Sequence, residues 1–281
     1  MDLSKLLLLI EEVPAYRRLV AELEKKGNSS RVAVLDAAKP YLIASLYHRW
    51  QQPVLVVTAQ PENSKKLYEQ LLTWSAKRRV MLFPEPDALP YESIPPDKAA
   101  DLERLQVLSS LAGINADDKQ TLPLLIVTSA MALVQKVTPH DDFTAACHTI
   151  RVGMNIEPFH LLSQWQAMGY RLESMVAVPG TMSHRGGIID IYPPTSDLPA
   201  RLEFLGNTIE SIRLFDPTDQ RSLRAVSSLA IAPATERYTS SGENKEETGK
   251  ASILDYFPPD ALLILDEPES IERVVADLAV K

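Results

Sequence analysis

The sequence has 281 residues, 45% of them hydrophobic, which is enough for a sizeable core in one large domain or two of ordinary size. Its single cysteine, Cys147, excludes an internal disulfide and a multi-cysteine zinc site, and its five histidines are scattered without metal-ligand spacing, so we expect no bound metal. The formal net charge of −8 excludes a generally basic surface for nucleic acid.

The first half of the chain alternates between helix and strand patterns. Two helices interrupted by Pro14 are expected within the first 26 residues. Short apolar runs then predict strands over 31–35, 53–58, 80–83 and 124–128, and helices are predicted over 41–50, 62–74 and 98–111. Apolar strands that alternate with helices are typical of a parallel sheet covered on both faces, so we assign residues 1–138 to an α/β domain.

The pattern changes near Pro139, where shorter segments alternate in polarity and are separated by turn residues. A helix is predicted over 158–168, and the Gly206-Asn207 turn predicts a hairpin between strands 200–205 and 208–215. A simple hairpin would place Glu203 opposite Glu210, which is unfavourable for two like charges. We therefore expect residues 139–215 to form a smaller, antiparallel α+β domain that is inserted into the α/β domain.

Residues 216–281 are expected to return to the α/β domain and complete it. The stretch 233–250 is polar and predicts a linker, and it is followed by a buried strand over 261–265 and a helix over 270–280. This last helical pattern runs almost to the final residue, which suggests a fragment of a longer protein. The apolar run Leu6–Ile10 is too short to span a membrane and no signal peptide is evident, so we expect a cytoplasmic protein.

An ordinary phosphate-binding loop is excluded where a nucleotide-binding fold would carry one. No glycine occurs between Gly27 and Gly113, Lys39 stands at the usual lysine position, and Pro40 replaces the Ser or Thr that would hold Mg²⁺. The 261–265 strand ends in Asp266 and Glu267, like a Mg²⁺-binding acidic segment, but such residues need a phosphate loop beside them. We therefore expect no catalytic residue and no cofactor.

The sharpest local pattern is the run from Ser183 to Tyr192, in which two glycines precede a strand that carries Asp190. On the neighbouring predicted strand, Arg201, Glu203 and Leu205 share one face by alternation, and Arg185 could lie nearby. Two interpretations stay open: an internal network of ion pairs on a solvated sheet face, or an arginine-bearing surface that binds a protein.

Five segments carry a resemblance to a known family. They are FPEPDALPYESIPPDKAADLERLQVLSSL, LLIVTSAMALVQKVTP, GYRLESMVAVPGTMSHRGGIIDIYPP, LPARLEFLGNTIESIRLFDPTDQRSL and IAPATE. In order and spacing the chain resembles the amino-terminal region of the bacterial transcription-repair coupling factors, the Mfd family, over roughly residues 30–281. It is also similar to the damage-recognition protein UvrB, but the missing glycines favour the coupling factors.

The resemblance implies a degenerate RecA-like, helicase-like domain without ATPase function, in which Lys39, Asp266 and Glu267 are vestigial. It further implies that the insertion binds UvrA, with Arg185 and Arg201 as contacts and Leu205 where the family has an aromatic residue. The full-length family also carries an RNA polymerase-binding domain and an ATP-dependent DNA translocase, through which it contacts DNA, and we expect these outside this chain.

The expected function is therefore that of a non-catalytic module that recruits UvrA in transcription-coupled nucleotide excision repair. One alternative is a fragment of a UvrB-type, ATP-dependent repair helicase. Another is an autoinhibitory domain that contacts the remainder of its own chain.

Overall fold

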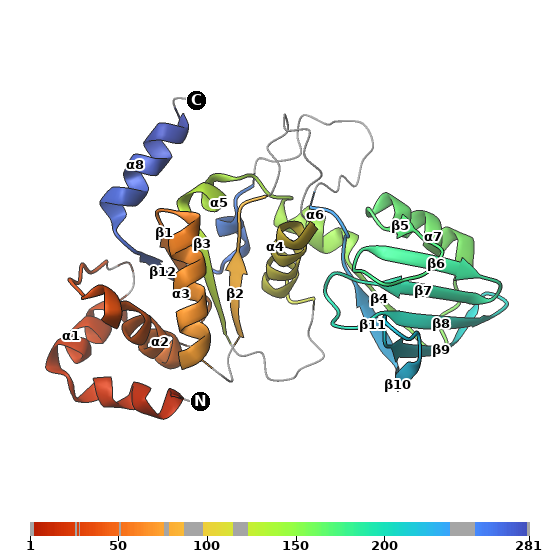
Figure 1. Ribbon diagram of the computed structural model, residues 1–281, viewed down its shortest axis with the longest axis horizontal. Coiled ribbons are helices and arrows are strands. Elements are labelled where there is room, and N and C mark those ends of the chain that lie inside the picture. The colour runs from red at the N-terminus through yellow and green to blue at the C-terminus, as the bar shows by residue number, and fades with distance from the viewer. Residues whose placement is uncertain are drawn as a thin grey trace. The chain divides into compact units, whose positions relative to one another are not determined.

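The computed structural model describes residues 3–25, 27, 29–50, 52–75, 79–86, 98–114, 123–236 and 251–279. The fold divides into two compact units, each built from segments that are discontinuous in sequence (Figure 1). Unit 1 contains residues 1–85, 120–134 and 257–281, and unit 2 contains residues 86–119 and 135–256.

Unit 1 contains a parallel sheet with the strand order β12-β1-β3-β2. Its strands are β1 (Val54–Thr58), β2 (Arg79–Phe83), β3 (Leu124–Ser129) and β12 (Leu262–Leu265). The central strands β1 and β3 are buried along their whole length, as expected for apolar strands in a covered parallel sheet. The parallel sheet predicted from the apolar runs is confirmed.

Helices pack around this sheet. They are the 3₁₀ helix η1 (Ser4–Glu12), α1 (Pro14–Leu23), the 3₁₀ turn η2 (Asp36–Ala38), α2 (Lys39–Arg49), α3 (Pro61–Trp74), α5 (Ala130–Val134) and α8 (Pro268–Ala279). Proline starts or nearly starts α1, α2, α3 and α8, where its missing N–H costs no helical hydrogen bond. Tyr47 of α2 is fully buried, and its hydroxyl donates to the Pro123 carbonyl oxygen at 2.6 Å.

The strand predicted over residues 31–35 is wrong. This segment has no strand pairing among the described residues, and Val32 and Leu35 are exposed, Leu35 to 82%. Both edges of β1 are already paired, with β3 and β12. An apolar, β-branched run favours an extended backbone, but a strand also needs a neighbour, and the run itself does not specify one.

Unit 2 is built on a six-stranded sheet with the order β10-β9-β8-β7-β6-β5. Its strands are β5 (Arg171–Leu172), β6 (Thr181–Arg185), β7 (Ile188–Tyr192), β8 (Ala200–Leu205), β9 (Thr208–Phe215) and β10 (Ser222–Val226). All neighbours are antiparallel except β5 and β6. The antiparallel α+β character predicted for this part of the chain is confirmed.

In the described part of unit 2 the remaining elements are four helices and a two-stranded ladder: α4 (Lys98–Leu111), α6 (His140–Ala146), α7 (Pro158–Ala167), the 3₁₀ helix η3 (Ile253–Tyr256), and β4 (His148–Arg151) paired with β11 (Ser228–Ile231). Because β10 pairs with β9, the sheet continues past the boundary expected at residue 215, and unit 2 also takes in α4. The domain limits 139–215 stay a prediction. From residue 237 on, the predicted linker 233–250 lies outside the described residues.

The predicted pairing of Glu203 with Glu210 is wrong, although the hairpin itself is confirmed. The register of β8 and β9 shifts between Glu203 and Phe204, so that Glu203 lies opposite Ser211 and Glu210 is the extra residue. The Ser211 hydroxyl donates to Glu203 Oε2 at 2.6 Å. The β-bulge thus replaces a repulsive pair of carboxylates with a hydrogen bond.

Helix α7 lies beside the six-stranded sheet (Figure 1). One face of the sheet packs against it around Trp165, which is fully buried. The Trp165 indole N–H donates to His148 Nε2 at 3.0 Å, so this nitrogen must be unprotonated to accept. Burial lowers the pKa of His148 below its ordinary value of 6.5. The hydrogen bond between Trp165 and His148 therefore requires the neutral form of the histidine.

Acidification is expected to weaken unit 2 through His148. Because the folded pKa lies below the unfolded one, this contribution is present above pH 6.5 and is lost as the pH falls through the folded pKa. The slope contributed by this group is at most about 1.4 kcal/mol per pH unit. Urea unfolding between pH 7.5 and 5, followed by tryptophan fluorescence, should show a steeper loss for wild type than for His148→Gln. Parallel curves would contradict the assignment.

Candidate protein-binding site

The second face of the six-stranded sheet is polar and carries the residues singled out in the sequence. Cross-strand register places Asp190 beside both Ser183 and Arg201, and Ile188 beside both Arg185 and Glu203. Neighbours across a ladder point to the same side of a sheet, so these residues share one face. Residues at the alternate positions, such as Ile189, Ile191 and Leu202, belong to the core under α7.

Two glycines shape the turn between β6 and β7. Gly186 has φ +61°, a conformation that L side chains rarely adopt. A Cβ added at Gly187 would lie 3.1 Å from the Phe204 carbonyl oxygen, and the Gly187 carbonyl accepts from Phe204 N–H at 2.8 Å. This close approach of β8 to the turn brings Arg185, at the end of β6, to the same edge of the face as Glu203.

Arg201 is held within the protein. Its Nε and Nη2 donate to Asp190 Oδ1 and Oδ2, each at 2.8 Å, and its guanidinium carbon lies 4.8 Å from the Phe215 ring centroid. The hydrogen bonds with Asp190 raise the pKa of Arg201. Next to this pair, Arg213 Nη2 lies 3.6 Å from Glu203 Oε2. The network of internal ion pairs considered from the sequence is thus present around Arg201.

Arg185 and Leu205 are presented differently. Arg185 is exposed, and its Nη2 donates to the Ser174 carbonyl oxygen; no carboxylate in the described part of the chain forms an ion pair with it. Leu205 is 72% exposed at the end of β8. The face therefore combines an exposed cation and an exposed apolar side chain with a second arginine that is already bonded.

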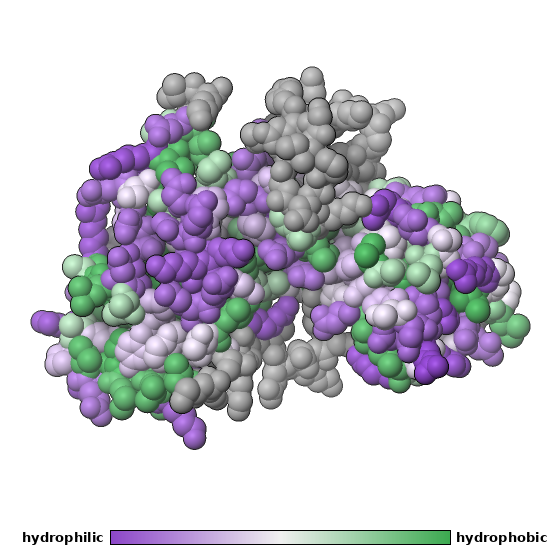
Figure 2. Space-filling view, viewed as in Figure 1, coloured by the Kyte–Doolittle hydropathy of each residue, from purple (hydrophilic) through white to green (hydrophobic). Residues whose placement is uncertain are grey.

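Two further exposed apolar residues lie close to Arg185 and were missed in the sequence. Ile188 is its cross-strand partner, and Met175 follows Ser174, whose carbonyl Arg185 contacts. Alternation with Asp190 could have placed Ile188 on this face. Met175 lies in an irregular segment, where no periodicity signals orientation. Figure 2 shows hydrophobic residues scattered among hydrophilic ones on the visible surface of unit 2.

Unit 1 brings together the three positions expected to be remnants of a nucleotide site. Lys39 Nζ lies 2.8 Å from Asp36 Oδ1, 2.8 Å from Asp266 Oδ1 and 3.2 Å from Glu267 Oε1. Partial burial alone would lower the pKa of Lys39, but the hydrogen bonds that its ammonium donates to the three carboxylates outweigh burial and raise that pKa. The lysine that would hold a phosphate in an active relative is thus occupied by carboxylates.

We expect no Mg²⁺-dependent binding of ATP, because a phosphate would have to displace three carboxylates from Lys39 and finds no glycine loop there. Calorimetric titration with ATP and Mg²⁺ should give no saturable heat for wild type. Lys39→Ala serves as the matched control and should look the same. Saturable binding that Lys39→Ala removes would instead support the UvrB-type alternative.

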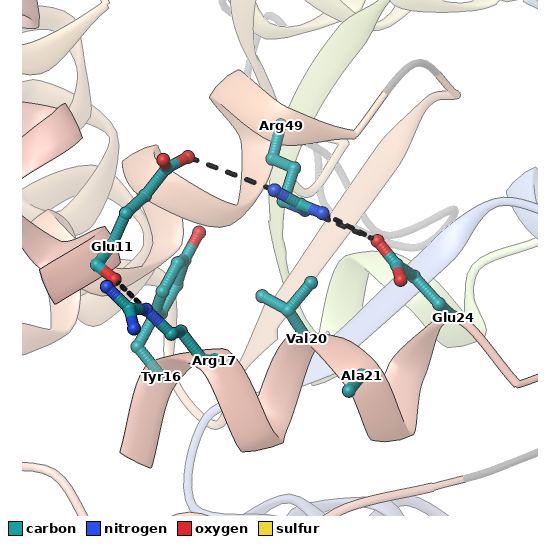
Figure 3. A pocket seen from close by; sticks show the side chains of 7 residues that line it. All are labelled: Glu11, Tyr16, Arg17, Val20, Ala21, Glu24 and Arg49. Atoms are coloured by element: carbon teal, nitrogen blue, oxygen red, sulfur yellow. Dashed lines mark hydrogen bonds and ion pairs between the residues drawn. The ribbon is translucent and has the colours of Figure 1, made fainter. Parts of the chain in front are cut away.

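A cavity of about 300 Å³ in unit 1 is lined largely by residues of η1 and α1 and by Arg49 of α2 (Figure 3). Arg49 of α2 reaches between Glu24, at 2.9 Å, and Glu11, at 3.9 Å, and so joins three helical segments. The charged groups that line the cavity thus form ion pairs with one another, which is typical of a structural contact between helices. Among the described residues no group of His, Cys, Asp or Glu side chains is arranged to hold a metal. None of the helices in these residues has both the length and the apolar composition of a membrane-spanning segment.

Comparison with known proteins links the chain to DNA repair. Residues 149–237, which include Arg185, Arg201 and Leu205, match the UvrB interaction domain family. The chain is 26% identical to the transcription-repair-coupling factor of Bacillus subtilis over 96% of its length, and 32% identical to that of Myxococcus xanthus over 79%. It is 35% identical to the one of Mycobacterium tuberculosis over 68%. The chain spans 27%, 18% and 15% of these relatives' lengths.

Proposed function

We propose that this chain recruits UvrA as a non-catalytic binding module. The premise is that it matches the UvrB interaction domain family and is similar over most of its length to one part of the transcription-repair coupling factors. Recruitment of UvrA to stalled transcription is the step at which such a module would act in nucleotide excision repair. The proposed partner surface is the polar sheet face of unit 2.

The observation that carries the proposal is the exposed pair of Arg185 and Leu205 inside the matched domain. Arginine is enriched among the residues that dominate binding energy, and an adjoining apolar side chain gains most when a partner excludes water from it. In the proposal Arg185 and Arg201 are the charged contacts and Leu205 is the hydrophobic one.

The ion-paired Lys39 supports the non-catalytic part of the proposal, since its ammonium at the vestigial phosphate position is already paired with three carboxylates. We assign ATP-dependent DNA translocation, RNA polymerase binding and DNA contact to other parts of the longer relatives. A cytoplasmic location belongs to the same proposal.

Direct binding of the purified chain to purified UvrA tests the function. Biosensor measurements with immobilised UvrA should show saturable binding that free chain competes away. If the chain does not bind UvrA but does bind the remaining part of a full-length relative, the autoinhibitory alternative is supported instead.

A further inference from the structure

Asp190 is a nearly buried carboxylate in the middle of the candidate site. Its side chain is 10% exposed, and that of Arg201, its neighbour across the ladder, is 23% exposed. A buried carboxylate requires a partner, and Arg201 supplies two N–H groups at 2.8 Å. Since Asp190 itself offers so little surface, any effect it has on binding must act largely through Arg201.

The two hydrogen bonds to Asp190 determine which edge of the Arg201 guanidinium remains available. A guanidinium has five N–H groups, and Asp190 accepts from the edge formed by Nε and Nη2. The Gln220 carbonyl oxygen lies 3.5 Å from Nη1, at the limit of a hydrogen bond. The end-on edge formed by Nη1 and Nη2 therefore keeps donors for a further acceptor.

Two other groups lie beside the guanidinium. The Phe215 ring, fully buried, lies 4.8 Å from the guanidinium carbon. Gln220 has φ +62°, an uncommon conformation for a side chain of this kind, and its amide donates to Val176 and Pro217 carbonyls at 3.0 and 2.8 Å. These bonds hold the strained loop residue beside Arg201.

The charges on the face divide into two kinds. Arg201 with Asp190, and Arg213 with Glu203, form two pairs that each sum to zero. Arg185 has no such carboxylate in the described part of the chain. A neutralised pair attracts a distant carboxylate weakly, whereas an uncompensated cation attracts it strongly and in a salt-dependent way.

We propose that Asp190 is a positioning residue for binding: it fixes Arg201 so that the end-on edge meets a neutral acceptor oxygen of the partner, while Arg185 meets a carboxylate. This inference rests on the proposed function, because it presumes that UvrA contacts this face. It adds the chemistry of the two partner groups and a residue that the sequence did not single out as a contact.

The test is a double-mutant cycle on UvrA affinity at several salt concentrations. Asp190→Asn should weaken binding by about tenfold or more and steepen the salt dependence, because it releases an uncompensated cation. In an Arg201→Ala background the same change should cost less than about twofold, since its target is gone. Arg185→Ala should flatten the salt dependence, whereas the neutral double variant Arg201→Ala, Asp190→Asn should weaken binding and leave the salt dependence as in wild type.

Arg201→Lys provides an independent arm should Asp190→Asn fail to fold. Lysine keeps the positive charge but lacks the planar guanidinium with its paired N–H donors, so this variant should bind as poorly as Arg201→Ala. Wild-type affinity of Arg201→Lys would overturn the inference. So would equal costs of Asp190→Asn in both backgrounds with an unchanged salt slope, which is the result of a merely structural role. If the wild-type chain does not bind UvrA at all, it is the proposed function that fails.

Discussion

Glu236→Ala is expected to lower the free energy of unfolding by about 3–5 kcal/mol. Glu236 accepts two hydrogen bonds from Arg104 of α4, from Nε and Nη2, each at 2.7 Å. The Arg104 side chain is 1% exposed and that of Glu236 is 13% exposed. Removing the carboxylate leaves a cation that is buried in the intact fold without this counter-charge.

Urea unfolding at pH 7 measures this effect, and two variants control it. Arg104→Met combined with Glu236→Leu should recover most of the stability, because the buried charge and its partner are removed together. Glu24→Ala breaks an ion pair with Arg49 whose two side chains are about half exposed, and it should cost at most about 1 kcal/mol. Equal costs for Glu236→Ala and Glu24→Ala would contradict the buried-pair argument.

Removal of Arg185 and Arg201 together is expected to produce the largest loss of UvrA affinity. Truncating one partner of a desolvated charge pair costs about 2–5 kcal/mol, which is roughly 30-fold to several thousand-fold in the dissociation constant. Arg185→Ala alone is the cleaner variant, because Arg185 is exposed and, among the described residues, its side chain bonds to a single backbone carbonyl. Arg201→Ala also strips Asp190 of its partner, so its folding needs to be checked by circular dichroism.

Biosensor titration against UvrA checks this prediction. The matched control is Arg224→Ala, which removes an exposed arginine from β10 of the same sheet and should leave affinity within about twofold. Wild-type affinity in the Arg185→Ala, Arg201→Ala double variant would remove both residues from the proposed site.

Local sequence patterns predicted helices and strands correctly where the pattern lies within one short segment of the chain. Helix α4 and the hairpin strands β8 and β9 have the predicted bounds, because helical periodicity and a Gly-Asn turn are properties of a few adjacent residues. The strand expected over 31–35 failed because a strand requires a partner elsewhere in the chain. The opposition of Glu203 and Glu210 failed because one bulged residue changes the register of everything beyond it.

The sequence by itself determined the fold class, the lack of an ordinary phosphate loop, and the arginines worth testing, since glycine content and residue type do not depend on folding. Only the tertiary structure decided which charges meet. The fold places Lys39 beside Glu267, which lies 228 positions further along the chain. It also pairs Arg201 with Asp190 and leaves Arg185 without a carboxylate partner among the described residues. An ion pair depends on separations of a few ångströms between segments distant in sequence, and the order of residues along the chain does not contain those separations.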